Sequence, residues 1–230
     1  MSWSRVRVET ICKSRFAEPR TSVYPLVKRA IDAVCSAVLL ALLSPLLAFI
    51  ALAIRLDSPG AAMFRQTRVG RWGREFTMVK FRSMFVDADE EVHRKFAVEY
   101  INGSGCQAGS GQAVFKPNGD RRVTRVGKWL RRTSLDELPQ LINVLRGEMS
   151  LVGPRPAVPY EVDQYAAWHL QRLAVPPGLT GLAQISGRSG LTFEKIVWLD
   201  LQYIESRSTA TDLLILLRTI PVVLKAKCVA

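Results

Sequence analysis

Two adjacent carboxylates, Asp136 and Glu137, lie in the segment of this chain whose residue types best suit phosphate chemistry. Arg131 precedes them and Pro139 follows them. A proline is tolerated only in the first turn of a helix, so we expect a helix that begins near Asp136 and ends at Gly147. Asp136 is then the expected N-cap, where backbone N–H groups and the helix dipole favour its ionised form. An ionised aspartate can act as a nucleophile toward phosphorus.

Glu137 supplies a second carboxylate beside that candidate nucleophile. Mg²⁺ is commonly held by one or two carboxylates together with substrate phosphate oxygens, so Glu137 is a candidate Mg²⁺ ligand. The alternative is structural, because Ser134 and Glu137 have the S-x-x-E spacing of a capping box. The two acids alone do not decide between catalysis and capping, so the surrounding cations matter.

Three further cations are candidates for phosphate binding. Lys80 and Arg82 are two residues apart, and in a strand they point to the same face, toward a phosphate or toward the carboxylates. A solvated basic strand edge is the alternative. Arg155 lies between Pro154 and Pro156, which fix the backbone on both sides and favour a planar, bidentate phosphate contact.

Two further candidates lie nearer the C-terminus. The glycine-rich stretch 176–190 allows the backbone to approach a ligand closely and carries Arg188 as another cation, although ordinary turns explain the glycines equally well. Asp200 and Tyr203 share one face of an expected helix. Asp200 is therefore a second candidate acid at the site, or else a cap or surface residue.

The net charge of the chain is +12, from 32 Lys and Arg against 20 Asp and Glu, so its partners should be anionic. Nucleotide phosphates and anionic membrane lipids fit this charge. Nucleic acid is excluded as a partner because no zinc-finger, RRM or helix-turn-helix pattern is present. The four cysteines show no CxxC spacing, which indicates a reducing compartment and no metal cluster.

A run of apolar residues over 33–54 is long enough to cross a bilayer core. Lys28 before it and Arg55 after it place positive charge, the mark of the cytoplasmic side, at both ends. Ser44 and Pro45 lie at its middle, where the proline kinks a helix. We therefore expect a re-entrant helix that returns to the face it entered. A simple span and a buried soluble hairpin are the alternatives.

The expected fold class is α+β, with a short β-sheet and amphipathic interfacial helices in a small cytoplasmic domain. The expected organisation is a basic N-terminal arm over 1–24, lying on the membrane or disordered, then a re-entrant membrane helix hairpin over 25–56 and a membrane-associated catalytic domain over 57–230. Short strands joined by a tight turn at 70–73 are predicted early in that domain. A glycine- and serine-rich loop is predicted over 102–120.

Several segments together resemble the bacterial sugar transferases, the monotopic phosphoglycosyl transferases. They occur in the order of that family and cover nearly all of the chain after Tyr24: KRAIDAVCSAVLLALLSPLLA, FRQTRVG, FTMVKFRSM, RVTRVGKWLRRTSLDELPQLINVLRGEMSLVGPRP, PGLTGLAQISGR and DLLILLRT. The resemblance implies transfer of a sugar-1-phosphate from a UDP-sugar to undecaprenyl phosphate, with release of UMP, at the cytoplasmic face of the bacterial inner membrane. The sequences RVTRVG and SGRSG are most similar to the branch of this family that uses hexose-1-phosphates such as galactose or glucose.

The resemblance also implies roles for individual residues. Asp136 is the implied nucleophile of a covalent phosphosugar intermediate, Glu137 helps to place Mg²⁺, and Arg155 holds nucleotide phosphate. The implied site is also lined by Lys80, Arg82 and Arg131, and Ser44-Pro45 matches the re-entrant break.

The chain departs from the family at GLAQ and ESRSTATD, where many relatives have a tryptophan, so the donor sugar stays open. A homodimer is left open as well. The rival interpretations are a basic membrane-anchored scaffold that binds anionic lipids without catalysis, and direct one-step transfer without a covalent intermediate.

Overall fold

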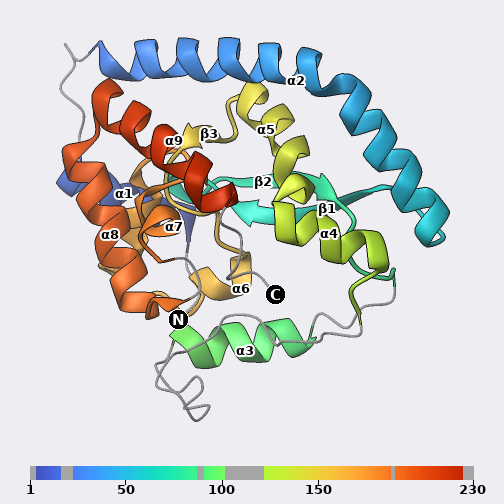
Figure 1. Ribbon diagram of the computed structural model, residues 1–230. Helices are drawn as coiled ribbons and strands as arrows, with labels where there is room; N and C mark the ends of the chain where they lie inside the picture. Colours follow the sequence, from blue (N-terminus) through green and yellow to red (C-terminus); the bar gives the residue numbers. More distant parts are fainter. Residues whose placement is uncertain (1–3, 17–22, 87–90, 102–121, 188–189, 225–230) are drawn as a thin grey trace.

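The structure is a computed structural model, and it describes residues 4–16, 23–86, 91–101, 122–187 and 190–224 (Figure 1). Arg188 and the loop predicted over 102–120 lie outside these ranges. Helices surround two small sheets of two strands each in the described part of the chain. This mixture of helices with short strands confirms the expected α+β class.

The long apolar segment forms one helix, α2 (Tyr24–Asp57), which contains Pro45 and bends in its middle (Figure 1). Pro45 has no N–H to donate to the preceding turn, and the Ser44 hydroxyl donates to the Ala41 carbonyl oxygen at 2.8 Å. The two arms of the bent helix do not pack against one another. Most of its apolar side chains are exposed, and α2 is the one described helix long and apolar enough to cross a membrane.

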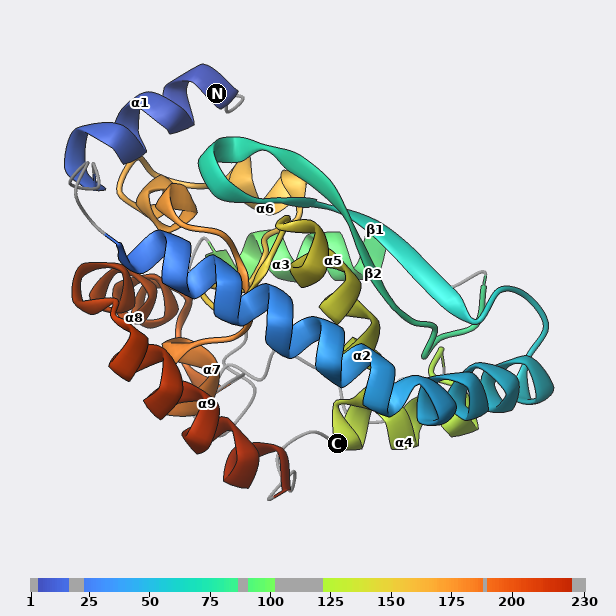
Figure 2. The same cartoon turned by 90° about the horizontal axis from the view of Figure 1, so that it is seen from above.

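The next elements, β1 (Met63–Val69) and β2 (Glu75–Phe81), form an antiparallel hairpin with Phe64 opposite Lys80. A short 3-10 turn, η1 (Arg71–Gly73), joins the two strands, so the predicted strands and their tight turn are confirmed. Figure 2 shows the hairpin running beside α2, with α9 on the other side of that helix.

The acidic pair lies between two helices, α4 (Arg125–Thr133) and α5 (Leu141–Arg146). The connecting residues form a 3-10 helix, η2 (Leu135–Gln140), and α5 ends as expected at Gly147, whose φ is 81°. The expected N-cap is wrong. Ser134, with φ 57°, both ends α4 and begins η2, so Asp136 is already inside the first helical turn. The Ser134 side chain makes no cap hydrogen bond, so the capping box does not form either.

The rest of the domain packs around a second, parallel pair of strands, β3 (Ser150–Val152) and β4 (Gly178–Thr180). The main core lies between these strands, α5 and α8, with Leu141, Val144, Val197 and Ile204 fully buried. The remaining elements are α3 (Glu91–Ile101), α6 (Pro159–Val162), η3 (His169–Ala174), α7 (Leu182–Ser186), α8 (Phe193–Ser206) and α9 (Thr209–Leu224).

The N-terminal residues form a helix, α1 (Arg5–Phe16), which packs against η3. Val8 and Cys12 are fully buried there, and the Cys12 thiol lies 3.4 Å from the Leu170 carbonyl oxygen that it donates to. Val8 and Cys12 are four residues apart, so they share one helix face and bury it together. The expectation of a disordered arm is therefore wrong for residues 5–16, while contact of this arm with the membrane stays a prediction.

Candidate active site

Asp136 and Glu137 lie in the first turn of η2, partly buried and next to β2. The buried Asn143 of α5 fixes this arrangement. Its amide oxygen accepts from the Val79 N–H at 3.0 Å, and its amide nitrogen donates to the Thr77 carbonyl oxygen at 2.7 Å. Asn143 thus binds the backbone of β2 on both sides of Met78. These two hydrogen bonds fix α5, and with it the preceding η2 that carries the two acids, against β2. Sequence reasoning missed Asn143, since its role comes from hydrogen bonds to the backbone of a distant strand.

Lys80 is the centre of the charge cluster at this place. The pKa of Lys80 is lowered to about 8, mainly by burial and also by charge repulsion from Arg68, Arg155 and Arg131, while the Asp136 carboxylate opposes the shift. Charged groups of β1, α4, η2 and the loop after β3 therefore lie close enough to Lys80 to act on its charge. The structure thus brings together Asp136, Lys80, Arg131 and Arg155, which the sequence singled out separately.

Arg131 lies in the last turn of α4, where its Nε donates to the Ser83 hydroxyl at 2.9 Å. Gly127, one helical turn earlier, lets α4 approach that serine. A Cβ on Gly127 would lie 2.1 Å from the Ser83 carbonyl oxygen. The glycine is therefore needed for the close contact that positions Arg131.

Arg68 of β1 is a site residue that sequence reasoning missed. It is buried, and its two terminal nitrogens donate to the Pro156 carbonyl oxygen at 2.9 Å and to the Gln66 side chain at 2.7 Å. Burial lowers the pKa of Arg68 to about 10, and nearby Arg155 adds to that shift. The signals for it in the sequence were its place in the segment FRQTRVG and its position on the same strand face as Gln66. Arg68 holds the loop that carries Arg155.

Arg155 itself is exposed, and its backbone is held rather than its side chain. The carbonyl oxygen of Pro154 accepts from the Gly178 N–H at 2.8 Å, and the Arg155 carbonyl oxygen accepts from Arg172 Nη2 at 3.4 Å. The two flanking prolines restrict the same stretch of backbone. The guanidinium is thus presented from a fixed loop and stays open to a ligand.

Asp200 lies behind that loop and is buried, 1% exposed, in the middle of α8. Its carboxylate lies 2.6 Å from Arg172 Nη2, and Arg172 Nη1 donates to the Tyr165 hydroxyl at 2.8 Å. Burial raises the pKa of Asp200, and the Arg172 guanidinium opposes that rise. The alternatives of a cap or a surface residue are therefore wrong. Asp200 reaches the site through Arg172 and the Arg155 carbonyl group.

Arg82 turns away from the acidic pair. It is buried, and it donates to the Ser58 carbonyl oxygen at 2.7 Å, to the Ser58 hydroxyl at 3.0 Å and to the Pro59 carbonyl oxygen. The strand β2 ends at Phe81, so the alternation that would place Arg82 beside Lys80 stops before it. Arg82 fixes the link between α2 and β1, and a role for it in phosphate binding stays a prediction.

Asp136 and Glu137 are the carboxylates available for a divalent cation at this site. Among the described residues, no group of three or more His, Cys, Asp or Glu side chains could hold a metal ion. Two carboxylates suit Mg²⁺, which completes its coordination with substrate phosphate oxygens and water. They do not suit a metal that requires a full set of protein ligands.

Comparison with known proteins agrees with the family resemblance seen in the sequence. The family described as "Bacterial sugar transferase" matches residues 23–226. A UDP-glucose:undecaprenyl-phosphate glucose-1-phosphate transferase of Caulobacter vibrioides is 44% identical over 88% of this chain and 71% of the relative. The exopolysaccharide production protein ExoY of Rhizobium meliloti is 40% identical over 86% of this chain and 85% of the relative.

Some relatives are much longer than this chain. An undecaprenyl-phosphate galactose phosphotransferase of Salmonella typhimurium is 40% identical over 86% of this chain, but the match spans only 40% of that relative. The chain therefore corresponds to less than half of the galactose-transferring protein.

Proposed function

The chain belongs to the bacterial sugar transferase family, and we propose that it transfers glucose-1-phosphate or galactose-1-phosphate from a UDP-sugar to undecaprenyl phosphate, releasing UMP. The reaction class is supported by the names of the relatives. The observation that carries it in this chain is that Asp136, Arg131 and Arg155 all lie close enough to Lys80 to act on its charge. The product would start assembly of a surface polysaccharide.

In the proposed first step, a carboxylate oxygen of Asp136 attacks the phosphorus that bears the sugar. A bond forms between that oxygen and phosphorus, and the bond from the same phosphorus to the bridging oxygen breaks, so UMP leaves with its electron pair. In the second step an oxygen of undecaprenyl phosphate attacks the same phosphorus. The bond to Asp136 then breaks and restores the carboxylate.

The cations explain how a carboxylate could attack an anionic substrate. Lys80, Arg131 and Arg155 neutralise the diphosphate and stabilise the charge that grows on the leaving oxygen. Their positions are fixed before substrate binds, by Ser83 for Arg131 and by the held backbone for Arg155. Such fixed charges act without the cost of reorganisation during the reaction.

Mg²⁺ is the expected cofactor, with Glu137 as its main protein ligand. When bound, it would neutralise charge on the substrate phosphates. Asp136 beside it remains the attacking group, so the two acids have different roles.

We further propose that α2 is re-entrant and that the catalytic domain lies on the cytoplasmic face. The bend of α2, Pro45 at its middle and the cations at both ends support this topology. It is tested in a variant without native cysteines, by adding one cysteine before Lys28 or one after Arg55. Both positions should label from the same side of the membrane, and labelling from opposite sides would contradict the topology.

The transfer reaction is tested by measuring UMP release from a panel of UDP-sugars with undecaprenyl phosphate and Mg²⁺. Wild type should release UMP from UDP-glucose or UDP-galactose, and Asp136→Asn should not. The matched control is Asp163→Asn, which removes an exposed carboxylate outside the site and should keep full activity. If wild type and Asp136→Asn release UMP equally from every UDP-sugar, the acids serve only to form the helix start. That result would favour the interpretation of the chain as a non-catalytic scaffold.

A further inference from the structure

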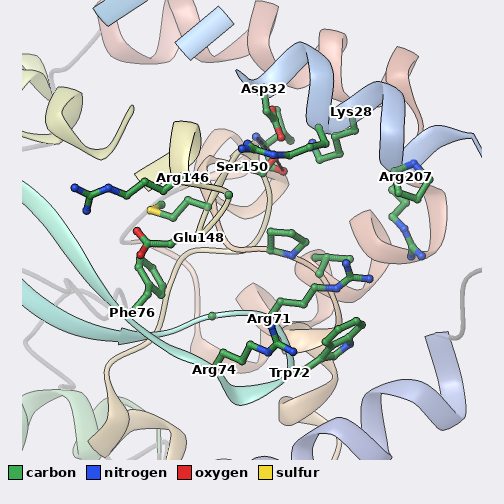
Figure 3. Close-up of a pocket in the computed structure, with 18 of the residues that line it drawn as sticks. Lys28, Asp32, Arg71, Trp72, Arg74, Phe76, Arg146, Glu148, Ser150 and Arg207 are labelled. Atoms are coloured by element: carbon green, nitrogen blue, oxygen red, sulfur yellow. Dashed lines mark hydrogen bonds between the residues drawn. The ribbon is translucent and has the colours of Figure 1, made fainter. Parts of the chain in front are cut away.

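A cavity of about 490 Å³ lies away from the two acids, beneath the N-terminal arm of α2 (Figure 3). The β1–β2 turn and the ends of α5 and α8 close its other sides, and we call it the α2 pocket. Arg74, at the β1–β2 turn, is six residues from Lys80, which corresponds to about 20 Å along an extended strand. The cationic residues that line the α2 pocket are Lys28, Arg29, Arg71, Arg74, Arg146 and Arg207.

The α2 pocket has a surplus of positive charge. Three acids line it, Asp32, Glu75 and Glu148, and Asp212 pairs with Lys28 at 2.7 Å. Among the described residues that line the pocket, the cations outnumber the acids six to three. Asp32 is buried and accepts from the Leu151 N–H at 3.1 Å, so its carboxylate is already occupied.

The surplus lies on arginines that have no carboxylate partner. Arg29 donates to the carbonyl oxygens of Val144 and Leu145, both at 2.7 Å, which leaves its charge uncompensated by an acid. Arg74 and Arg146 form no ion pair with any residue that the structure describes. Figure 3 shows that the labelled cations come from separate parts of the fold, with Lys28 on α2, Arg146 at the end of α5 and Arg207 just after α8.

Trp72 lies at the rim of the α2 pocket, in the β1–β2 turn. Trp72 has φ 58°, a conformation that non-glycine residues rarely adopt. Its ring lies 4.1 Å from the Arg71 guanidinium carbon, 5.9 Å from that of Arg74 and 5.3 Å from Lys13 Nζ. Cations at such distances are attracted to the indole ring. The ring therefore helps to hold Arg71 and Arg74 at the rim before any ligand arrives.

We propose that the α2 pocket binds a phosphate group, separately from the phosphates handled at Asp136. Arginines from several elements match the several oxygens of one phosphate, and the cavity has the size of an ordinary ligand site. The arm of α2 above it exposes Leu26, Val34 and Val38, so the chains of a lipid could follow that arm while its headgroup phosphate enters the pocket. An anionic phospholipid is the ligand that this location favours, and a free phosphate is the other source of the same chemistry.

The experiment uses the full chain in detergent and measures binding of three probes by calorimetry: dihexanoyl-phosphatidylglycerol, dihexanoyl-phosphatidylcholine and inorganic phosphate. The test variant is Arg74→Gln/Arg146→Gln. The matched control is Arg94→Gln/Lys95→Gln, which removes two exposed charges from α3, at the far end of the molecule from α2 (Figure 1). Arg74→Lys/Arg146→Lys keeps the charge and should restore most of the binding.

We expect phosphatidylglycerol to bind wild type and the control alike, and the glutamine variant to bind it about ten-fold or more weakly, since each surface cation contributes to holding an anionic headgroup. Phosphatidylcholine should bind weakly to all variants. Tight binding of inorganic phosphate with the same dependence on Arg74 and Arg146 would support the phosphate site and assign it to a free ligand. Equal loss in the test and control variants, or no binding of either anionic probe to wild type, would overturn the proposal.

UMP release is measured on the same preparations to show that they are folded. Arg74 and Arg146 have no part in the proposed transfer, so the glutamine variant should keep the turnover of wild type. A failure of the α2 pocket to bind phosphate would therefore leave the transfer reaction untouched, and a loss of transfer in Asp136→Asn would leave the pocket untouched.

Discussion

The ion pair of Asp200 and Arg172 gives a prediction that tests how the site is supported. Asp200→Asn removes the charge that compensates a fully buried guanidinium, while keeping the size of the side chain. The pair is closed at 2.6 Å, and the two side chains are 2% and 6% exposed. Arg172 also donates to the Arg155 carbonyl oxygen, so the change should act on both stability and catalysis.

The size of the expected loss in the free energy of unfolding follows from the burial of the ion pair. Removing one partner of a buried ion pair costs about 3–5 kcal/mol, because the remaining charge is left uncompensated. Asparagine still offers an oxygen to Arg172, so we expect a loss of about 3 kcal/mol in the free energy of unfolding. A domain typically has about 5–15 kcal/mol in total, so the variant should fold. Loss of the Arg155 position should lower kcat/KM for the UDP-sugar by about ten-fold to a hundred-fold.

The assay combines denaturant unfolding in detergent with UMP release below the unfolding transition. A double-mutant cycle with Asp200→Leu and Arg172→Met separates the pair from its surroundings. Since the double variant leaves no buried charge, it should be at least about 2 kcal/mol more stable than the sum of the single losses predicts. Asp163→Asn, an exposed carboxylate, should change stability by less than about 0.5 kcal/mol.

Two results would refute this reasoning. Additive losses in the cycle would show that Asp200 and Arg172 do not act as a pair. Full kcat/KM in a folded Asp200→Asn variant would show that the pair supports the fold without positioning Arg155.

Two further predictions concern the cations of the site. The pKa of Lys80 is lowered to about 8, so its positive charge is present below that pH and is lost above it. We therefore expect kcat/KM to fall as the pH rises through about 8. Lys80→Arg keeps the charge at higher pH and should abolish that fall. An unchanged pH profile in Lys80→Arg would assign the fall to another group. Gly127→Ala should lower the free energy of unfolding by about 1–3 kcal/mol and should also lower UMP release. The added Cβ would press on the Ser83 carbonyl group and move Ser83, the hydrogen-bond partner of Arg131. The control Ala210→Gly, at an exposed position of α9, should leave UMP release unchanged. Normal stability in Gly127→Ala would show that α4 can shift freely.

Local rules predicted those parts of the fold that depend on neighbouring residues. The strands and the turn at 70–73 follow from alternation and glycines, and the stop at Gly147 follows from its left-handed conformation. The start at Asp136 was wrong because Ser134 serves two helices at once, which no single-helix rule anticipates.

Residues that act through long-range contacts could not be placed from the sequence. Arg82 and Lys80 look equivalent in a strand pattern, yet Arg82 binds the carbonyl groups of Ser58 and Pro59. Arg68 and Arg172 were not singled out from the sequence, because each acts by donating to a backbone carbonyl oxygen of the loop that carries Arg155. Asp200 was identified as a candidate, but its buried partner, and therefore its positioning role, became visible only in three dimensions.

The most direct test of the proposed mechanism is the intact mass of the protein after incubation with its UDP-sugar and Mg²⁺ without undecaprenyl phosphate. A covalent intermediate predicts a mass increase of one hexose phosphate on Asp136, absent from Asp136→Asn and removed when undecaprenyl phosphate is added. UMP release that requires both substrates together, with no adduct under any condition, would contradict the covalent mechanism and favour direct transfer.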